Sequence, residues 1–246
     1  MQSRQSTLRD GIALTFAALF PLVIAFVYFV VLAVEEGDVH PMFKIALGAG
    51  KAIQFAFPVV YVALFDLGQL RLSRPSTNGV LIGAGFGVAV GLAMFALYFG
   101  AVRHIPAVAS DTPSMIFGKL QQLGYTTILG YWLVAVAICV VHSLMEEYYW
   151  RWFVFGRMRR YWSFAPAAVL SSIAFMLHHV VVLGVFFPGH FWTLSIPFSL
   201  CVAFGGCVWA WIYDRTGSIY AAWLSHALID AAILILGFWM LRDRLT

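Results

Sequence analysis

The chain has little charge, and this scarcity limits what it can be. Asp, Glu, Lys and Arg make up 11% of its 246 residues, whereas hydrophobic residues make up 62%. Soluble domains usually carry about 25% charged residues. With a mean hydropathy of +0.88, a water-soluble globular fold is excluded. The length instead accommodates several membrane spans of roughly 20 residues each.

Cysteine and basic clusters are also scarce. The three cysteines, Cys139, Cys201 and Cys207, all lie in apolar runs. Their spacing matches neither a disulfide framework nor a zinc site built from paired cysteines, so we expect them to pack as small apolar side chains. The sequence shows no basic tail and no basic segment interleaved with aromatic residues, which argues against a nucleic-acid partner.

Long apolar runs are abundant. We expect seven membrane-spanning helices, at roughly 12–34, 45–65, 79–100, 128–156, 165–187, 195–213 and 219–241. The first run is too long for the apolar part of a cleaved signal peptide. Polar clusters at 35–41 and 71–78 separate the early spans, and residues 104–126 could add an eighth membrane-associated helix. The sequence therefore predicts one all-α domain over 1–246, a polytopic transmembrane helical bundle in a lipid bilayer.

The basic residues predict an orientation. Lys and Arg favour the cytoplasmic side of membrane proteins, and a cytoplasmic N-terminus places nine of them inside and six outside. The strongest contribution to this bias comes from Arg157, Arg159 and Arg160, which we expect to lie against anionic lipid headgroups. We therefore expect a multi-pass protein of the cell (inner) membrane with its N-terminus in the cytoplasm.

Ionisable residues within a membrane are costly, so each needs a reason. In the fourth span, Glu147 and Arg151 are four residues apart and can pair, which leaves Glu146 without an arginine. A partly desolvated carboxylate can act as a general base, and His142 lies one turn before Glu146 on the same face. The structural alternative is a simple ion pair at a helix end.

Two further spans carry polar side chains. In the fifth span Phe175 and His179 share a helix face, whereas His178 is expected to point elsewhere and is left outside the candidate set. In the seventh span His226 and Asp230 share a face, and an aspartate at this depth needs a partner or a proton. Each pair alone could be a structural hydrogen bond. Because a rise of 1.5 Å per residue places all these groups about 10–20 Å deep, we expect them to meet in one cavity that opens to the cytoplasm.

These segments resemble the three ordered motifs of the CAAX protease and bacteriocin-processing (CPBP) family of glutamic-type intramembrane endopeptidases. The residues that carry the resemblance are Glu146-Glu147-x-x-x-Arg151, Phe175-x-x-x-His179 and His226-x-x-x-Asp230, preceded by a similar lead-in at 216–220. The matching region covers about 130–241. The resemblance implies a membrane protease, a hydrolase of membrane-associated or lipidated peptide substrates that requires no cofactor.

The resemblance also implies roles for individual residues. Glu146 would activate a water molecule with help from His179, and His226 with residue 230 would stabilise the oxyanion. The supporting residues would be Glu147, Arg151 and Phe175. Many family members carry Asn where this chain has Asp230, and an ionised aspartate would repel an oxyanion. A protonated Asp230 could still donate a hydrogen bond, but we favour a role in orienting His226.

Three other functions stay open at this point. Glu146, His179, His226 and Asp230 are all competent zinc ligands, although the sequence lacks a His-Glu-x-x-His motif, so a zinc-dependent membrane protease is one alternative. A non-catalytic membrane scaffold or bacteriocin-immunity protein is the second. A proton relay or transporter is the third, but the sequence shows no sign of the repeated, interrupted helices that transporters often have.

Overall fold

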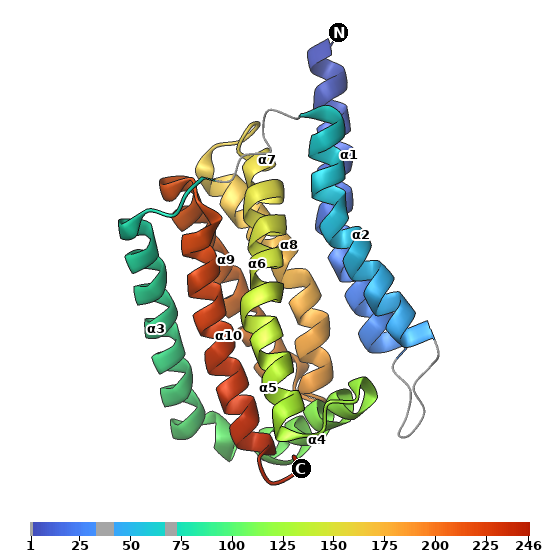
Figure 1. Ribbon diagram of the computed structural model, residues 1–246, viewed down its shortest axis with the longest axis vertical. Helices are drawn as coiled ribbons and strands as arrows, with labels where there is room; N and C mark the ends of the chain where they lie inside the picture. Colours follow the sequence, from blue (N-terminus) through green and yellow to red (C-terminus); the bar gives the residue numbers. More distant parts are fainter. Residues whose placement is uncertain (1, 33–41, 67–72) are drawn as a thin grey trace.

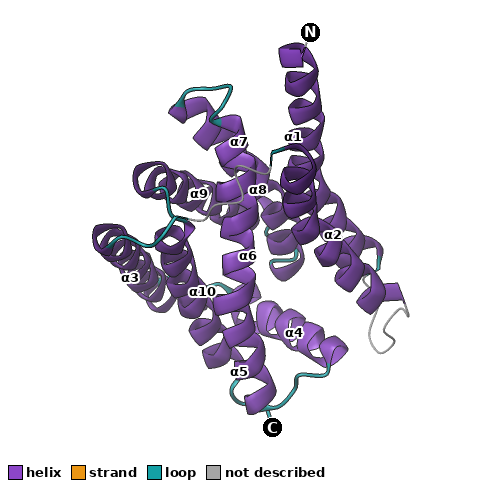
Figure 2. Cartoon of the chain, turned by 45° about the horizontal axis from the view of Figure 1, so that its top comes forward, coloured by secondary structure: helices purple, strands orange, loops and turns teal. Residues whose placement is uncertain are grey.

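The computed structural model describes residues 2–32, 42–66 and 73–246, and the regular structure within these ranges is entirely helical (Figures 1 and 2). Seven helices in this part of the chain are long and apolar enough to cross a membrane. They are Ser6–Val31, Gly48–Phe65, Thr77–His104, Ile128–Met158, Phe164–Phe186, Phe191–Thr216 and Ile219–Leu241. The predicted polytopic helical bundle is thus confirmed. The predicted connection at 35–41 and residues 71 and 72 of the next one lie outside the described residues.

Three helices form the first part of the bundle. They are α1 (Gln2–Phe26), extended by the π-helical turn η1 (Val27–Val31), α2 (Met42–Phe65) and α3 (Thr77–Gly100). Helices α1 and α2 lie side by side at one edge of the molecule, and α3 lies at the opposite edge (Figure 1). The remaining spans fill the space between these edges.

The fourth span is one continuous helix with two π-helical segments. It consists of α5 (Ile128–Val136), η4 (Ala137–His142), α6 (Ser143–Glu147), η5 (Tyr148–Phe155) and α7 (Gly156–Met158). The two glutamates therefore end a short α-helical stretch between π-helical turns. Such turns occur frequently at functional sites, and they change which side chains share a helix face.

The last three spans surround the fourth. They are α8 (Phe164–Phe186), α9 (Ile196–Thr216), which follows the π-helical turn η6 (Phe191–Ser195), and α10 (Ile219–Leu241). Helix α6 lies in the middle of the bundle, with α10 on one side and α8 on the other (Figures 1 and 2). Three separate motifs are thereby brought next to one another.

An additional helix, α4 (Pro106–Leu123), follows the short 3-10 turn η3 (Val102–His104). It lies at the end of the bundle where α3 ends and α5 begins (Figure 1), and it is not among the seven candidate spans of the described residues. The Thr112 hydroxyl donates to the Phe186 carbonyl over 3.0 Å, and Arg244 donates to the Ser114 hydroxyl over 3.1 Å. The extra helix expected within 104–126 therefore exists. Because α3 ends and α5 begins at the same end of the bundle (Figure 1), the third and fourth spans run in opposite directions.

Helices α3 and α10 approach each other closely through glycine. A Cβ atom on Gly83 would lie 2.1 Å from the carbonyl oxygen of Ala221, and one on Gly87 would lie 2.8 Å from that of Ser225. The spacing of these glycines, four residues apart, is typical of close helix packing in membranes. This contact fixes the position of α10, which carries the third motif.

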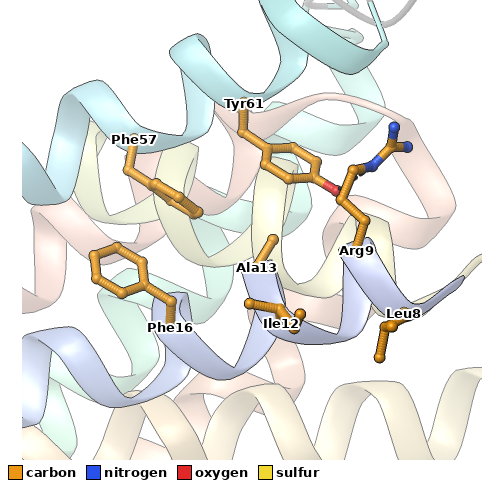
Figure 3. A pocket seen from close by; sticks show the side chains of 7 residues that line it. All are labelled: Leu8, Arg9, Ile12, Ala13, Phe16, Phe57 and Tyr61. Atoms are coloured by element: carbon orange, nitrogen blue, oxygen red, sulfur yellow. Dashed lines mark hydrogen bonds between the residues drawn. The ribbon is translucent and has the colours of Figure 1, made fainter. Parts of the chain in front are cut away.

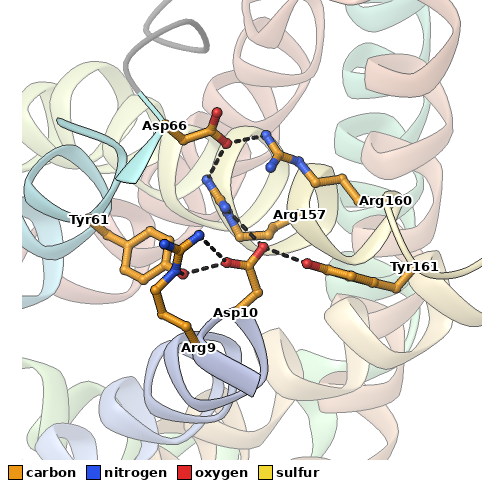
Figure 4. A network of polar contacts seen from close by, with 7 residues as sticks. All are labelled: Arg9, Asp10, Tyr61, Asp66, Arg157, Arg160 and Tyr161. Carbon is orange, nitrogen blue, oxygen red and sulfur yellow. Dashed lines mark hydrogen bonds and ion pairs between the residues drawn. The ribbon is translucent and has the colours of Figure 1, made fainter. Parts of the chain in front are cut away.

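A polar network joins α1, α2 and α7 near the N-terminal end of the bundle (Figure 4). The Asp10 carboxylate accepts hydrogen bonds from Tyr61 over 2.5 Å, from Tyr161 over 2.8 Å and from Arg157 over 3.1 Å. Arg157 also pairs with Asp66 over 3.2 Å. Arg157 is only 4% exposed, so the expectation that it lies against headgroups is wrong; its partner Asp10, far away in sequence, draws it into the protein.

A groove of about 450 Å³ runs between α1 and α2 (Figure 3). Its lining is apolar except for Arg9 and Tyr61, and it consists of Leu8, Arg9, Ile12, Ala13, Phe16, Phe57 and Tyr61. None of the candidate residues predicted from the motifs lines this groove. It is therefore separate from the site described next.

Candidate active site

Three histidines from three helices surround the Glu146 carboxylate. Its oxygens lie 3.2 Å from Nε2 of His142, 3.5 Å from Nε2 of His178 and 3.8 Å from Nε2 of His226. Glu146 is only 2% exposed. The predicted meeting of the three motifs at one place is therefore confirmed, whereas the side to which the site opens stays a prediction.

Glu147, the second carboxylate of α6, is fully buried and has two partners. One oxygen lies 3.1 Å from Nη1 of Arg151, as the four-residue spacing predicts. The same oxygen lies 2.8 Å from Nδ1 of His226. Because an ionised carboxylate can only accept hydrogen bonds, Nδ1 of His226 carries the proton in this contact. The opposite ring nitrogen, Nε2, then faces Glu146.

Asp230 lies beside His226 but does not orient it through a hydrogen bond. Its Oδ2 atom is 3.7 Å from Nε2 of His226, which is beyond hydrogen-bonding distance. The orienting contact that we assigned to Asp230 is made by Glu147 instead. The sequence spacing brought Asp230 to the correct face of α10, but it could not show that a carboxylate of another helix lies closer to the ring.

His179 and Phe175 share a face of α8, as predicted. Their ring centroids are 4.7 Å apart, and Nδ1 of His179 lies 3.1 Å from the Phe175 carbonyl oxygen. A neutral ring that donates from Nδ1 to this carbonyl leaves Nε2 free to accept a hydrogen bond elsewhere. This contact fixes the ring of His179 within the site.

The expectation that His178 points away from the site is wrong. Its side chain is buried, with Nε2 3.5 Å from Glu146, and its ring stacks on Trp150 at a centroid distance of 6.0 Å. Successive helix positions differ by about 100°, which still allows two adjacent imidazoles to flank one carboxylate. The packing of α6 against α8 decides this arrangement, and the sequence spacing alone does not reveal it.

Aromatic rings enclose the polar groups. Trp209 stacks on His226 with ring centroids 4.2 Å apart, and its indole nitrogen donates to the Ser225 hydroxyl over 3.0 Å. The Arg151 guanidinium lies 4.7 Å from the Phe175 ring centroid and 4.9 Å from that of Trp209. These rings hold the side chains in place and exclude polar solvent, which strengthens the interactions between the buried charges.

Part of the site could also hold a metal ion. One ligand atom from each of Glu146, His178 and His179 lies within 4.8 Å of the other two. Two imidazoles and one carboxylate form a set that binds zinc in many proteins. This set differs from the zinc ligands considered above, because His178 enters it while His226 and Asp230 lie outside.

The fold and the site together define an integral, multi-pass membrane protein whose buried Glu and His side chains converge between three helices. Residues 128–232 match the family model of the Rce1-like type II CAAX prenyl endopeptidases. The match includes all three motifs and confirms the family that they indicated. The match supports, in general terms, a membrane protease of the CAAX type. No curated protein and no solved structure matches the chain.

Proposed function

We propose that the chain is an intramembrane endopeptidase that hydrolyses a peptide bond of a membrane-associated or lipidated substrate. The observation that carries this proposal is the position of Glu146, a carboxylate buried in the middle of a membrane helix and surrounded by imidazoles. A buried carboxylate beside histidines can accept a proton from water. The family match of residues 128–232 supports the same reaction class.

In the proposed reaction, Glu146 accepts a proton from a water molecule while the water oxygen bonds to the carbonyl carbon of the peptide. His179 positions this water. The tetrahedral intermediate then breaks its carbon–nitrogen bond, and the proton held by Glu146 passes to the departing amine. One water molecule is consumed, and a carboxylic acid and an amine are formed, which become a carboxylate and an ammonium group when the acid proton passes to the amine.

His226 is the group that we assign to the oxyanion. Its Nδ1 is held by Glu147, so a proton on Nε2 would point toward the centre of the site. The ring can donate from both nitrogens only as an imidazolium, and that charge is stabilised by two carboxylates, Glu147 at 2.8 Å and Glu146 at 3.8 Å from the ring nitrogens. A preorganised donor of this kind stabilises developing negative charge without reorganisation during the reaction. Asp230 lies beside this ring, with its Oδ2 atom 3.7 Å from Nε2 of His226.

The proposal is tested by peptide cleavage in lipid vesicles that contain the purified protein. We would compare the parent chain with Glu146→Ala and His179→Ala, each checked for folding by its thermal unfolding. Cleavage by the parent that is lost in both folded variants supports the proposal. Cleavage that survives in both variants contradicts it.

A zinc-dependent protease is the second candidate, and the close grouping of Glu146, His178 and His179 favours it. A bound zinc ion would polarise the carbonyl or activate the water in place of the carboxylate. A chelator would then abolish cleavage, added zinc would restore it, and His178→Ala would be as damaging as His179→Ala. Under the metal-independent proposal, the chelator leaves the cleavage rate unchanged.

We also propose that the N-terminus faces the cytoplasm of a cell (inner) membrane. Helix α7 lies at the same end of the bundle as the start of α1 (Figure 1). Arg159 and Arg160 follow α7 directly in the chain and pair with Asp214 and Asp66. This concentration of arginine at one end favours the cytoplasmic side. Labelling of a single cysteine placed at the N-terminus, in intact cells, would show label only after permeabilisation if this orientation is right. Labelling in intact cells would contradict it.

A further inference from the structure

We propose that Lys51 and Gln54 of α2 form a binding site for a carboxylate group of the substrate, beside Glu146. This inference rests on the proposed protease function, and it names the chemistry by which that site would recognise its substrate. No part of the family match extends to α2, because the match begins at residue 128. The inference therefore comes from the structure of α2 and its contacts with the fourth span, and not from the family match.

Lys51 and Gln54 are three residues apart and share one face of α2. The Lys51 ammonium donates to Oε1 of Gln54 over 3.3 Å. Gln54 is only 1% exposed, and its Nε2 atom has no hydrogen-bond partner among the described residues. Since Oε1 accepts from Lys51, the opposite atom is the amide nitrogen, a donor. The pair therefore presents only donors: the free amide hydrogens and the remaining ammonium hydrogens.

This donor pair lies next to the candidate active site. The Lys51 ammonium lies 5.4 Å from the centroid of the Phe55 ring, which faces the fourth span. Phe55, the residue after Gln54, has its ring centroid 6.4 Å from that of His142. The Phe55 carbonyl accepts a hydrogen bond from the Tyr148 hydroxyl over 3.2 Å. Helix α2 thus packs against the fourth span at the level of the two glutamates.

Lys51 has no carboxylate partner at ion-pair distance among the described residues. The Lys51 ammonium contacts the Gln54 amide oxygen and the face of the Phe55 ring, whose centroid lies 5.4 Å away. A cation in a membrane span is costly unless a negative charge compensates it. Glu146 has to be available for proton transfer, so it is poorly suited to be this permanent partner. A carboxylate on the substrate would supply the missing charge and would accept from Gln54 as well.

Two parts of a peptide carry a carboxylate: its C-terminus and the side chain of Asp or Glu. Either would fit the same donors, because both present two acceptor oxygens. Peptides can separate the two sources. We would use three prenylated peptides of equal length: one with a free C-terminus, one with an amidated C-terminus, and an amidated one with an added Asp.

Binding is measured with the Glu146→Gln protein in lipid vesicles, so that cleavage does not interfere. We expect the free-acid peptide to bind more tightly than the plain amide. Lys51→Met should weaken binding of the acid by about 10- to 100-fold, the range of a hydrogen bond to a charged group, and leave the amide unchanged. Gln54→Leu should have a smaller effect in the same direction. If the Asp-containing amide recovers the tighter binding, a side-chain carboxylate is also accepted.

The chain offers a matched control for Lys51→Met. In α4, Lys119 donates to Gln122 over 3.1 Å with the same three-residue spacing, but this helix lies at the end of the bundle (Figure 1). Lys119→Met should leave binding of both peptides unchanged. In the cleaving parent chain, Lys51→Met should raise KM for the acid peptide and leave kcat nearly unchanged, the pattern of a lost binding contact.

Equal binding of the acid and amide peptides, or an equal loss of both in Lys51→Met, would overturn the carboxylate site. The two proposals fail differently. A preference for the acid without cleavage by the parent would uphold the carboxylate site and contradict the protease. Cleavage that depends on Glu146 but ignores the C-terminal charge would uphold the protease and overturn the carboxylate site.

Discussion

Glu147 holds His226 across a sequence distance of 79 residues, with Oε1 2.8 Å from Nδ1. The same oxygen pairs with Arg151 over 3.1 Å. One buried carboxylate therefore links α6 to α10 and sets the direction in which the His226 ring presents its other nitrogen. Glu146, its neighbour in sequence, faces the centre of the site. Two adjacent glutamates thus have different surroundings, and we expect them to respond differently to the same substitution.

Glu147→Gln should damage both stability and activity. The change leaves Arg151 buried without its compensating charge, which should lower the free energy of unfolding by about 3–5 kcal/mol. It also weakens the orientation of His226, and the loss of such a supporting contact typically costs about 10- to 100-fold in activity. Thermal unfolding in detergent and the cleavage rate test these two effects. A variant as stable and as active as the parent would contradict the assigned role.

Asp230→Asn should keep most of the activity. Its carboxylate lies 3.7 Å from Nε2 of His226, too far for a hydrogen bond, and Asn has nearly the same shape. We expect the cleavage rate to change by less than about tenfold, which corresponds to about 1.4 kcal/mol in the barrier. Complete loss of cleavage in a folded variant would show that the charge of Asp230 itself is needed.

Gly83→Ala should loosen the contact between α3 and α10. The added Cβ would lie 2.1 Å from the backbone oxygen of Ala221, so the helices must move apart, at a cost of about 1–3 kcal/mol. Gly85→Ala is the matched control, because a Cβ there would have no neighbour within 4 Å. Thermal unfolding of the two variants tests this directly. Equal stability of the two would argue against close packing at Gly83.

Asp10→Asn should weaken the network that joins α1 and α2 to α7 (Figure 4). The variant leaves Arg157 with one carboxylate, Asp66, in place of two. We expect a loss of about 1.5–3 kcal/mol, typical of a hydrogen bond to a charged group. Asp243→Asn, at an exposed aspartate near the C-terminus, should leave the unfolding temperature unchanged. A loss of equal size in both variants would contradict a specific role for Asp10.

The helices and the pairs within each helix could be predicted from the sequence. Apolar runs of about 20 residues have no other stable arrangement than a membrane span, and all seven were confirmed. The pair of Glu147 with Arg151 and the shared face of His226 and Asp230 follow from the helix repeat. These features depend only on residues close together in the chain.

Contacts between helices could not be predicted in the same way. The hydrogen bond from His226 to Glu147, the approach of His178 to Glu146 and the burial of Arg157 by Asp10 all depend on how helices distant in sequence pack. The π-helical segments around α6 add to this, because they change the register of side chains along the fourth span. A pattern of residue types does not contain this information.

The cleavage rate of Glu146→Gln in lipid vesicles, measured beside that of the parent chain, tests the central claim most directly. Gln keeps the shape of the side chain but cannot accept a proton from water. We predict a loss of at least about 100-fold, the lower range for a general base, with an unfolding temperature close to that of the parent. A folded Glu146→Gln protein that cleaves the same peptide at the parental rate would contradict the account.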